Sequence, residues 1–243
     1  MPRPPSQRSR DEGRVPLNRE RVMGGALAVA DTDGLGSLTM RSLAQHLEVK
    51  PMALYHYVAN KNEIIDGIVD LVYAEIELPS ADGDWRAGMV LRAQSAREVL
   101  RRHPWATALL QSRTAPGPAT LRHHDSIIGA LRGAGFSVTM TAHAFALLDS
   151  YIYGFALSEA TLPINGPETV AEVAESMMEQ YSIEAYPSLL EFSTEHIMKP
   201  DYDFGLEFQF GLDLILDGLT RSIPSSEGAK TGPSHSTLVT RLS

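Results

Sequence analysis

Residues 38–58 read LTMRSLAQHLEVKPMALYHYV, and this stretch decides the fold of the amino-terminal part of the chain. Leu43 and Leu47 are spaced four apart, which places both on one face of a short helix. After residues 48–50, Pro51 suits the first position of a second helix, because its missing N–H would have no helical partner there. The spacing therefore predicts two short helices joined by a tight turn.

One side of the second helix is expected to pack against the rest of the protein, and its other side is left to contact another molecule. Leu54 and Val58 dock it on its neighbours, and the small Ala44 on the first helix allows the two to cross closely. This arrangement is the helix-turn-helix pattern, whose second helix fits the DNA major groove. The residues expected to contact double-stranded DNA are Thr39, Met40, Arg41, Lys50, Pro51, Met52, Ala53, Tyr55, His56, Tyr57 and Lys61.

Most of these residues have a chemistry suited to DNA. Tyrosine hydroxyls donate to phosphate oxygens, and Lys50 and Lys61 neutralise phosphate charge. Met52 and Ala53 offer apolar contact to a thymine methyl group. Thr39, at the start of the first of the two helices, offers a hydroxyl and an N–H to a phosphate. The alternative explanation of the pattern is a small helical hairpin with half-buried tyrosines.

Charge is distributed unevenly along the 243 residues, whose formal net charge is −9. Residues 1–61 hold nine Lys/Arg and six Asp/Glu, whereas residues 62–243 hold twelve and twenty-four. A basic head on an acidic body agrees with nucleic-acid binding by the head, although arginines in the first fourteen residues create much of the asymmetry. The chain has no cysteine and no apolar run of the roughly 20 residues that a membrane span needs, so we expect a cytoplasmic protein without disulfides.

Apolar residues three and four apart recur through most of the chain, and no convincing strand pattern is found. We therefore predict an all-α protein with a four-helix head and a larger helical body. The expected helices span about 18–32, 37–47, 51–58, 61–77, 85–102, 104–110, 118–133, 138–160, 167–182, 187–198 and 203–221. The expected divisions are a disordered basic tail at 1–16, a helix-turn-helix domain at 17–62, the body at 63–223 and a disordered tail at 224–243.

The head resembles the DNA-binding domain of the tetracycline-repressor (TetR) family. The resemblance is carried by the LxxRxLAxxLxV core, the LYxYVxNK stretch, and the helices that precede and follow them. In the body, the segments RRHPWATALL, GALRGAGFS and DFGLEFQFGLDLILDGL resemble the tetracycline-repressor type of C-terminal domain. The resemblance implies a homodimer that binds a palindromic operator, and a C-terminal helical domain for dimerisation and for a small-molecule effector that releases the DNA.

The resemblance also suggests a dimer interface of four helices, to which each subunit contributes two long helices of its body. The helix at 138–160 and the last helix each carry apolar residues on one side, and ordinary core helices are the alternative. The residues expected on the interface side of the last helix are Phe204, Phe208, Leu212, Ile215 and Leu219.

An effector pocket is expected inside the body's own bundle, lined mostly by apolar side chains with few polar anchors. The candidate lining residues are Trp105, Leu109, Phe145, Tyr151, Met177, Met178 and Tyr181, for which core packing is the alternative. Tetracycline–magnesium is not the expected effector, because Glu77 and Leu110 stand where tetracycline-binding members place histidines. We expect a small, mostly apolar effector, and neither a cofactor nor a bound metal.

One residue departs from the family pattern. Glu48 stands at the turn position that is often glycine, where a left-handed backbone would cost roughly 1–2 kcal/mol.

The neighbours His123, His124 and Asp125 are expected on a solvated face rather than at a metal. No catalytic motif is found, so no catalytic residue is expected. The alternative function is a small-molecule-binding or enzymatic helical protein that has lost DNA binding.

Overall fold

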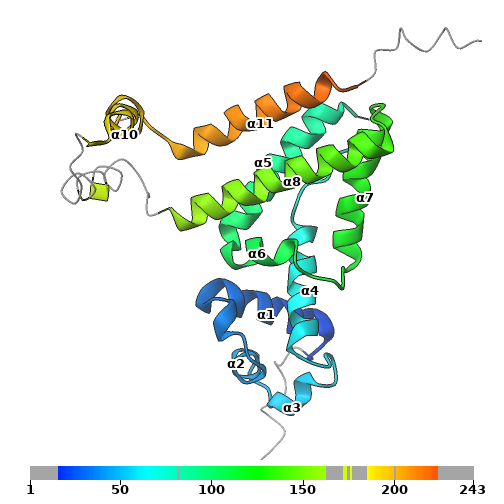
Figure 1. Cartoon of the computed structure of the whole chain (residues 1–243). Coiled ribbons are helices and arrows are strands. Elements are labelled where there is room, and N and C mark those ends of the chain that lie inside the picture. The colour runs from blue at the N-terminus through cyan, green and yellow to red at the C-terminus, as the bar shows by residue number, and fades with distance from the viewer. Residues whose placement is uncertain are drawn as a thin grey trace, which may run out of the picture. The chain divides into compact units, whose positions relative to one another are not determined.

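A computed structural model of the chain describes residues 16–80, 83–162, 172–173, 176, 185–199 and 201–223. The regular structure of these residues is helical throughout and includes no strand, which confirms the predicted all-α class (Figure 1). Within this part of the chain, no helix has the length and apolarity to cross a membrane. The predicted disordered tails, except for Pro16, and most of the helix expected at 167–182 lie outside the described residues.

The chain forms two compact units. The first unit comprises Met1–Glu77 and Ser95–His124, and the second comprises Leu78–Gln94 and Asp125–Ser243. The first unit contains α1 (Arg19–Asp33), η1 (Leu35–Ser37), α2 (Met40–His46), α3 (Pro51–Leu54), α4 (Lys61–Ala74), η2 (Pro104–Ala106) and α6 (Thr107–Leu110). The second contains α8 (Val138–Thr161), α10 (Pro187–Phe192), η4 (Ser193–Ile197) and α11 (Phe204–Thr220). Residues of α5 (Trp85–Arg102) and α7 (Pro118–Gly133) contribute to both units.

Two of the predicted helices of the head are shorter than expected. Residues 35–37 form a separate 3-10 turn, and α2 begins only after Thr39, whose side chain accepts a hydrogen bond from the Ser42 N–H as an N-cap. The helix expected at 51–58 ends at Leu54, because the chain then turns and both Tyr57 N–H and Val58 N–H bond to the Leu54 carbonyl. Periodicity marks the helical positions, but capping and turn hydrogen bonds decide the ends.

The core of the first unit is built from the apolar faces of α1, α2, α3 and α4. Gly25 of α1 lies so close to Leu47 that a Cβ atom there would stand 2.7 Å from the Leu47 Cδ2 atom. Leu54 of α3 and Ile68 of α4 are fully buried. This close packing fixes α3 in place, although a helix of four residues has little stability of its own.

In the second unit, α8 packs on α11 through aromatic rings. Tyr151 stacks on Phe208 with ring centroids 5.5 Å apart, and its hydroxyl donates to the Phe208 carbonyl at 2.9 Å. Phe155 stacks on Phe204 at 4.7 Å between the centroids. Arg92 of α5 and Asp149 of α8 form a buried ion pair in the same unit.

The face of α11 that was expected to form the dimer interface is mostly buried inside the chain itself. Phe208, Leu212 and Leu219 belong to the core of the second unit, so this part of the prediction is wrong. The opposite side of α11 exposes large apolar side chains instead, with Leu206 at 65%, Phe210 at 66% and Leu214 at 58% exposure. Both sides of α11 are apolar, so helical spacing alone could not tell the core side from the exposed side.

Candidate DNA-binding interface

The turn between α2 and α3 is closed by a backbone hydrogen bond and contains a left-handed residue. The Val49 N–H bonds back to the Ala44 carbonyl at 2.9 Å and closes the turn. Glu48 has a φ of 56°, and it is the one residue other than glycine with a positive φ in the described part of the chain. Arg21 of α1 donates to the Leu47 carbonyl at 3.4 Å, which ties the turn to the preceding helix.

The short helix α3 has one buried side and one exposed side, as predicted. Leu54 and, just after the helix, Val58 are buried against the rest of the first unit. Met52 is 72% exposed and Tyr55 is 49% exposed on the other side. Two large side chains that remain in water on a rigidly held helix are available to another molecule.

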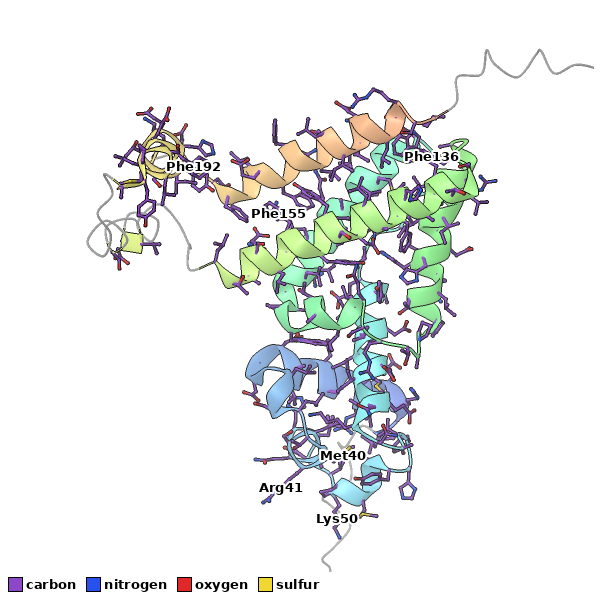
Figure 2. The ribbon with its side chains drawn as sticks, in the orientation of Figure 1. Met40, Arg41, Lys50, Phe136, Phe155 and Phe192 are labelled. Carbon is purple, nitrogen blue, oxygen red and sulfur yellow. The ribbon has the colours of Figure 1, made fainter. Side chains whose placement is uncertain are left out.

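The structure leaves every candidate DNA-contacting residue at least partly accessible. Those classed as exposed are Thr39, Arg41, Lys50, Pro51, Met52, Tyr55 and His56. Those of intermediate exposure are Met40, Ala53, Tyr57 and Lys61. Figure 2 shows the side chains of Arg41 and Lys50 extending away from the ribbon near α2 and α3. The predicted contact set therefore gathers around α3 and the amino end of α2.

Thr39 differs in detail from the expectation. Its N–H donates to the Ser42 hydroxyl oxygen at 2.9 Å, and its own hydroxyl oxygen accepts from the Ser42 N–H at 3.0 Å. These two bonds form a reciprocal capping box at the start of α2. The groups that were expected to hold a phosphate thus serve the cap of the helix.

Lys61 stands at the start of α4, and that end of the helix is held firmly. The Asn60 side chain caps α4 by accepting from the Glu63 N–H at 3.0 Å. The Glu63 carboxylate accepts from the Ala59 N–H at 2.7 Å and pairs with Arg19 of α1 at 3.0 Å. A lysine on a fixed helix end is a suitable point charge for a phosphate.

Sequence analysis missed Arg21 as a neighbour of the predicted DNA face. A groove of about 620 Å³ runs beside the turn, and Arg21, Glu48, Lys50 and Ala53 contribute to its walls. Two cations thus share this groove with one carboxylate. The signal in the sequence was weak, because Arg21 lies on a different helix, about thirty residues before Lys50.

The candidate effector-pocket residues are divided between the units. Trp105 and Leu109 lie in the first unit, where the Trp105 indole N–H donates to Asp31 at 2.7 Å. Phe145 and Tyr151 lie on α8 in the second unit, and both are half-buried. Met177, Met178 and Tyr181 lie outside the described residues. The hydrogen bonds of Tyr151 to α11 agree with the packing role that was the alternative for this set.

The histidines of α7 correct another expectation. His123 is fully buried rather than solvated, and its ring lies 5.0 Å from that of Tyr73, centroid to centroid. The error arose because helical spacing places residue 123 on the same face as the buried Ile127. Among the described residues, no group of three or more His, Cys, Asp or Glu is placed to hold a metal ion.

Residues 78–223 match the family described as "Tetracyclin repressor-like, C-terminal domain". The match covers more than half of the chain, and the helix-turn-helix unit precedes it. The chain belongs to the tetracycline-repressor (TetR) family. Members of this family are DNA-binding regulators of transcription, which confirms the resemblance carried by the head.

Relatives that match along about nine-tenths of the chain agree with this membership. The HTH-type transcriptional repressor DrrR1 of Streptomyces coeruleorubidus is 32% identical over 234 residues, which cover 90% of this chain and 85% of that protein. The tetracycline repressor protein class A from transposon 1721 of Escherichia coli is 28% identical over 225 residues, covering 89% and 98%. Both relatives are named as repressors.

Solved structures of the family share the fold of this TetR-family chain. ActR of Streptomyces coelicolor, in complex with (S)-DNPA, has a TM-score of 0.70 and 26% sequence identity, covering 86% of this chain and 100% of that chain. The same protein in complex with actinorhodin also has a TM-score of 0.70, with 25% identity, covering 87% and 100%. The all-α architecture is therefore the architecture of the TetR family.

Proposed function

We propose that this TetR-family protein is a transcriptional repressor that binds a palindromic operator as a homodimer and is released by a small, mostly apolar effector. The observation that carries the proposal is the exposed face of α3, where Met52 and Tyr55 stand in water while Leu54 is fully buried. Operator DNA lies in the cytoplasm, so the proposal implies a cytoplasmic protein. Repression by binding to an operator requires no enzymatic activity, and none is proposed.

The proposed reading of DNA separates two kinds of contact. Lys50 and Lys61 neutralise phosphates, whereas Met52 and Ala53 contact base edges in the major groove. Counterion release makes such binding depend on salt, and about six phosphate contacts would lower affinity by about 10³ between 50 and 200 mM salt. Arg21, beside Lys50 in the same groove, adds to the positive charge at this face.

The test begins with DNA fragments selected from a random pool by the wild-type protein. Binding is then measured by fluorescence anisotropy at several salt concentrations. Lys61→Ala is expected to weaken binding to all fragments alike and to reduce the salt slope by about one, and Met52→Ala is expected to change the preferred sequence. Arg122→Ala, an exposed cation on α7, is the matched control and should bind as the wild type does. Negligible and salt-insensitive binding to every fragment would support the alternative of a helical protein without DNA binding.

The homodimer is supported by the exposed apolar side of α11. Leu206, Phe210 and Leu214 are spaced four apart, so they form one stripe along the helix. On α8, Leu147 and Leu157 are exposed, and a Cβ atom at Gly154 would meet nothing within 4 Å. A small residue between exposed leucines allows another helix to approach closely. A second copy of the chain would bury these side chains in a four-helix interface.

Analytical ultracentrifugation tests the dimer. Phe210→Glu should shift the protein from dimer to monomer and weaken operator binding, because one chain then presents a single recognition helix. Leu121→Glu replaces an exposed apolar residue of α7 and should leave the dimer intact. A wild-type protein that sediments as a monomer at micromolar concentration would refute the dimer.

Release by an effector needs a route from the C-terminal domain to α3, and α4 provides contacts for it. The Tyr73 hydroxyl donates to the Leu110 carbonyl of α6 at 3.0 Å. Asp70 accepts from the Thr120 N–H at the start of α7 at 2.8 Å. A shift of α6 or α7 would therefore move α4, which also packs on α1. A tenfold loss of DNA affinity needs only about 1.4 kcal/mol of coupling.

The effector is sought by a thermal-shift screen of small apolar molecules. Molecules that raise the melting temperature should also release the protein from the selected DNA, and by linkage DNA should weaken their binding by the same factor. Ligands that stabilise the protein and leave its DNA affinity unchanged would contradict the proposed release.

A further inference from the structure

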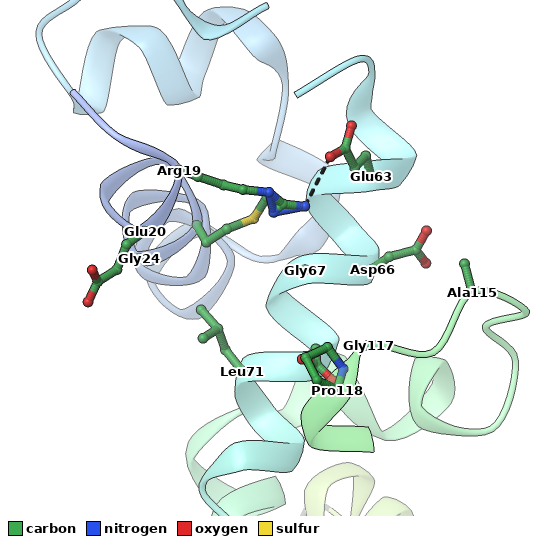
Figure 3. A pocket seen from close by; sticks show the side chains of 12 residues that line it. Arg19, Glu20, Gly24, Glu63, Asp66, Gly67, Leu71, Ala115, Gly117 and Pro118 are labelled. Carbon is green, nitrogen blue, oxygen red and sulfur yellow. Dashed lines mark hydrogen bonds and ion pairs between the residues drawn. The ribbon is translucent and has the colours of Figure 1, made fainter. Parts of the chain in front are cut away.

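A second site is indicated by a groove in the first unit, away from the exposed face of α3. The groove holds about 730 Å³ between α1, α4 and residues 115–118 (Figure 3). This volume is within the usual range of about 300–1,000 Å³ for small-molecule sites. Its walls are mainly apolar, with Met23 on one side and Leu71 and Pro118 on the others.

The walls of the groove are held together by polar contacts across its edges. Arg19 of α1 pairs with Glu63 of α4 at 3.0 Å, as Figure 3 shows. Arg113 pairs with Asp66 of α4 at 2.5 Å, and Asp70 accepts from the backbone N–H of Ala119 at 3.2 Å. These contacts fix α1, α4 and the segment before α7 relative to one another, so the groove is largely formed in advance of any ligand.

Gly24 points to an occupant, because no packing contact among the described residues requires a glycine at this position. Glycine in the interior of a helix is destabilising relative to alanine. At Gly25 and Gly67 the reason is packing, since an added Cβ atom would meet Leu47 at 2.7 Å and Met23 at 2.5 Å. At Gly24 an added Cβ atom would meet nothing within 4 Å. Gly24 lines the groove, and the lack of a side chain leaves that wall open to a close approach.

The charge of the groove selects the kind of occupant. The lining side chains include four carboxylates, from Glu20, Glu63, Asp66 and Asp70, against the single guanidinium of Arg19. Arg113 adds one more cation through its pair with Asp66, so negative charge remains in excess. An apolar surface with excess carboxylates attracts a cation that has an apolar body and repels the corresponding anion.

We propose that this groove binds a small organic cation with a flat apolar body, at a site distinct from the effector pocket of the C-terminal domain. The occupant lies between Gly24 of α1, Gly67 of α4 and Ala115, so it contacts both helices that flank the helix-turn-helix unit. The proposal does not depend on the identity of the effector or on the dimer.

The test uses a matched pair of probes, naphthylmethylammonium and naphthylacetate, which share an aromatic body and carry opposite charges. Isothermal titration calorimetry with the full chain should show binding of the cation, and at least about tenfold weaker binding of the anion. Gly24→Phe should fill the groove and weaken binding of the cation by at least about tenfold. Gly129→Ala, at a glycine of α7 that does not line the groove, is the control and should bind the cation as the wild type does.

A second blocking variant keeps the test independent of α1. Ala115→Trp fills the groove from the opposite wall, and it should also weaken binding of the cation by about tenfold. Circular dichroism checks that each variant is folded. The proposal is overturned if neither probe binds, if the anion binds as well as the cation, or if a folded blocking variant binds the cation as the wild type does.

Discussion

The His103 imidazole lies between two carboxylates, with its Nδ1 atom 2.7 Å from the Asp31 Oδ1 atom and its Nε2 atom 3.3 Å from the Glu75 Oε2 atom. Asp31 belongs to the last turn of α1, and Glu75 follows the end of α4. Trp105 donates to the same Asp31 oxygen, and Arg102 pairs with the same Glu75 oxygen. The segment between α5 and α6 is thus bonded to both helices that flank the helix-turn-helix unit.

Replacing His103 should loosen this junction. His103→Ala removes a buried ring and both of its polar contacts, so we expect a loss of about 2 kcal/mol in the free energy of unfolding. Because the junction joins α1 and α4 to the segment before α6, we also expect an effector to release DNA less efficiently from the variant. Urea denaturation measures the first effect, and an anisotropy titration of bound operator with effector measures the second.

His143→Ala is the matched control, because His143 is exposed on α8 in the second unit. It should leave the stability within about 0.5 kcal/mol of the wild type. If His103→Ala is as stable as this control, the imidazole does not bind the three segments together.

Glu48 carries the strain at the turn. Glu48→Asn should stabilise the protein by about 0.5–1 kcal/mol, because asparagine tolerates the left-handed backbone better than glutamate. Glu48→Gly should give a similar or smaller gain, since glycine relieves the strain but adds about 0.4–1 kcal/mol of backbone entropy to the unfolded chain. Both changes also remove a carboxylate beside the proposed DNA face and should strengthen operator binding.

Urea midpoints compare these variants with Gln45→Gly, an exposed position inside α2. There the backbone is helical, so glycine should destabilise the protein by about 1 kcal/mol. Loss of stability in Glu48→Asn would mean that the contacts of the Glu48 side chain outweigh the strain of its backbone.

The sequence was sufficient to identify the buried side of the short helices in the head, but it did not identify the core side of the last helix in the body. Leu43 and Leu47, and likewise Leu54 and Val58, are spaced four apart, and this spacing identified the buried side of each segment correctly. In α11 both sides carry large apolar residues, so spacing could not separate the side of the buried Phe208 from the side of the exposed Phe210. The groove beside Gly24 was invisible to sequence analysis, because its walls come from segments about forty-five and ninety residues apart.

The buried ion pair between Arg92 and Asp149 should be costly to break from one side. Asp149→Ala removes the carboxylate that the Arg92 guanidinium faces, and we expect a loss of about 3–5 kcal/mol in the free energy of unfolding. Arg92→Met combined with Asp149→Leu replaces the pair by apolar side chains of similar size. This double variant should recover most of the lost stability, because neither charge then has to be removed from water.

A double-mutant cycle with urea denaturation measures the coupling between the two residues. A double variant that is no more stable than Asp149→Ala would show that the second unit needs these charges for its structure. In that case the Arg92–Asp149 pair would be the first polar group to test for contact with an effector bound in the C-terminal domain.

The adjacent glycines of α1 should respond in opposite directions to the same substitution. Gly24→Ala adds a methyl group in open space and improves helix propensity, so it should stabilise the protein by about 0.5–1 kcal/mol. Gly25→Ala gains the same propensity but places its methyl group 2.7 Å from the Leu47 Cδ2 atom, which overpacks the contact between α1 and α2. Overpacking costs about 1–3 kcal/mol, so the net effect should be destabilising by about 1 kcal/mol. Urea denaturation of the two variants side by side checks the signs, and equal shifts would mean that Leu47 moves aside freely and does not hold the turn.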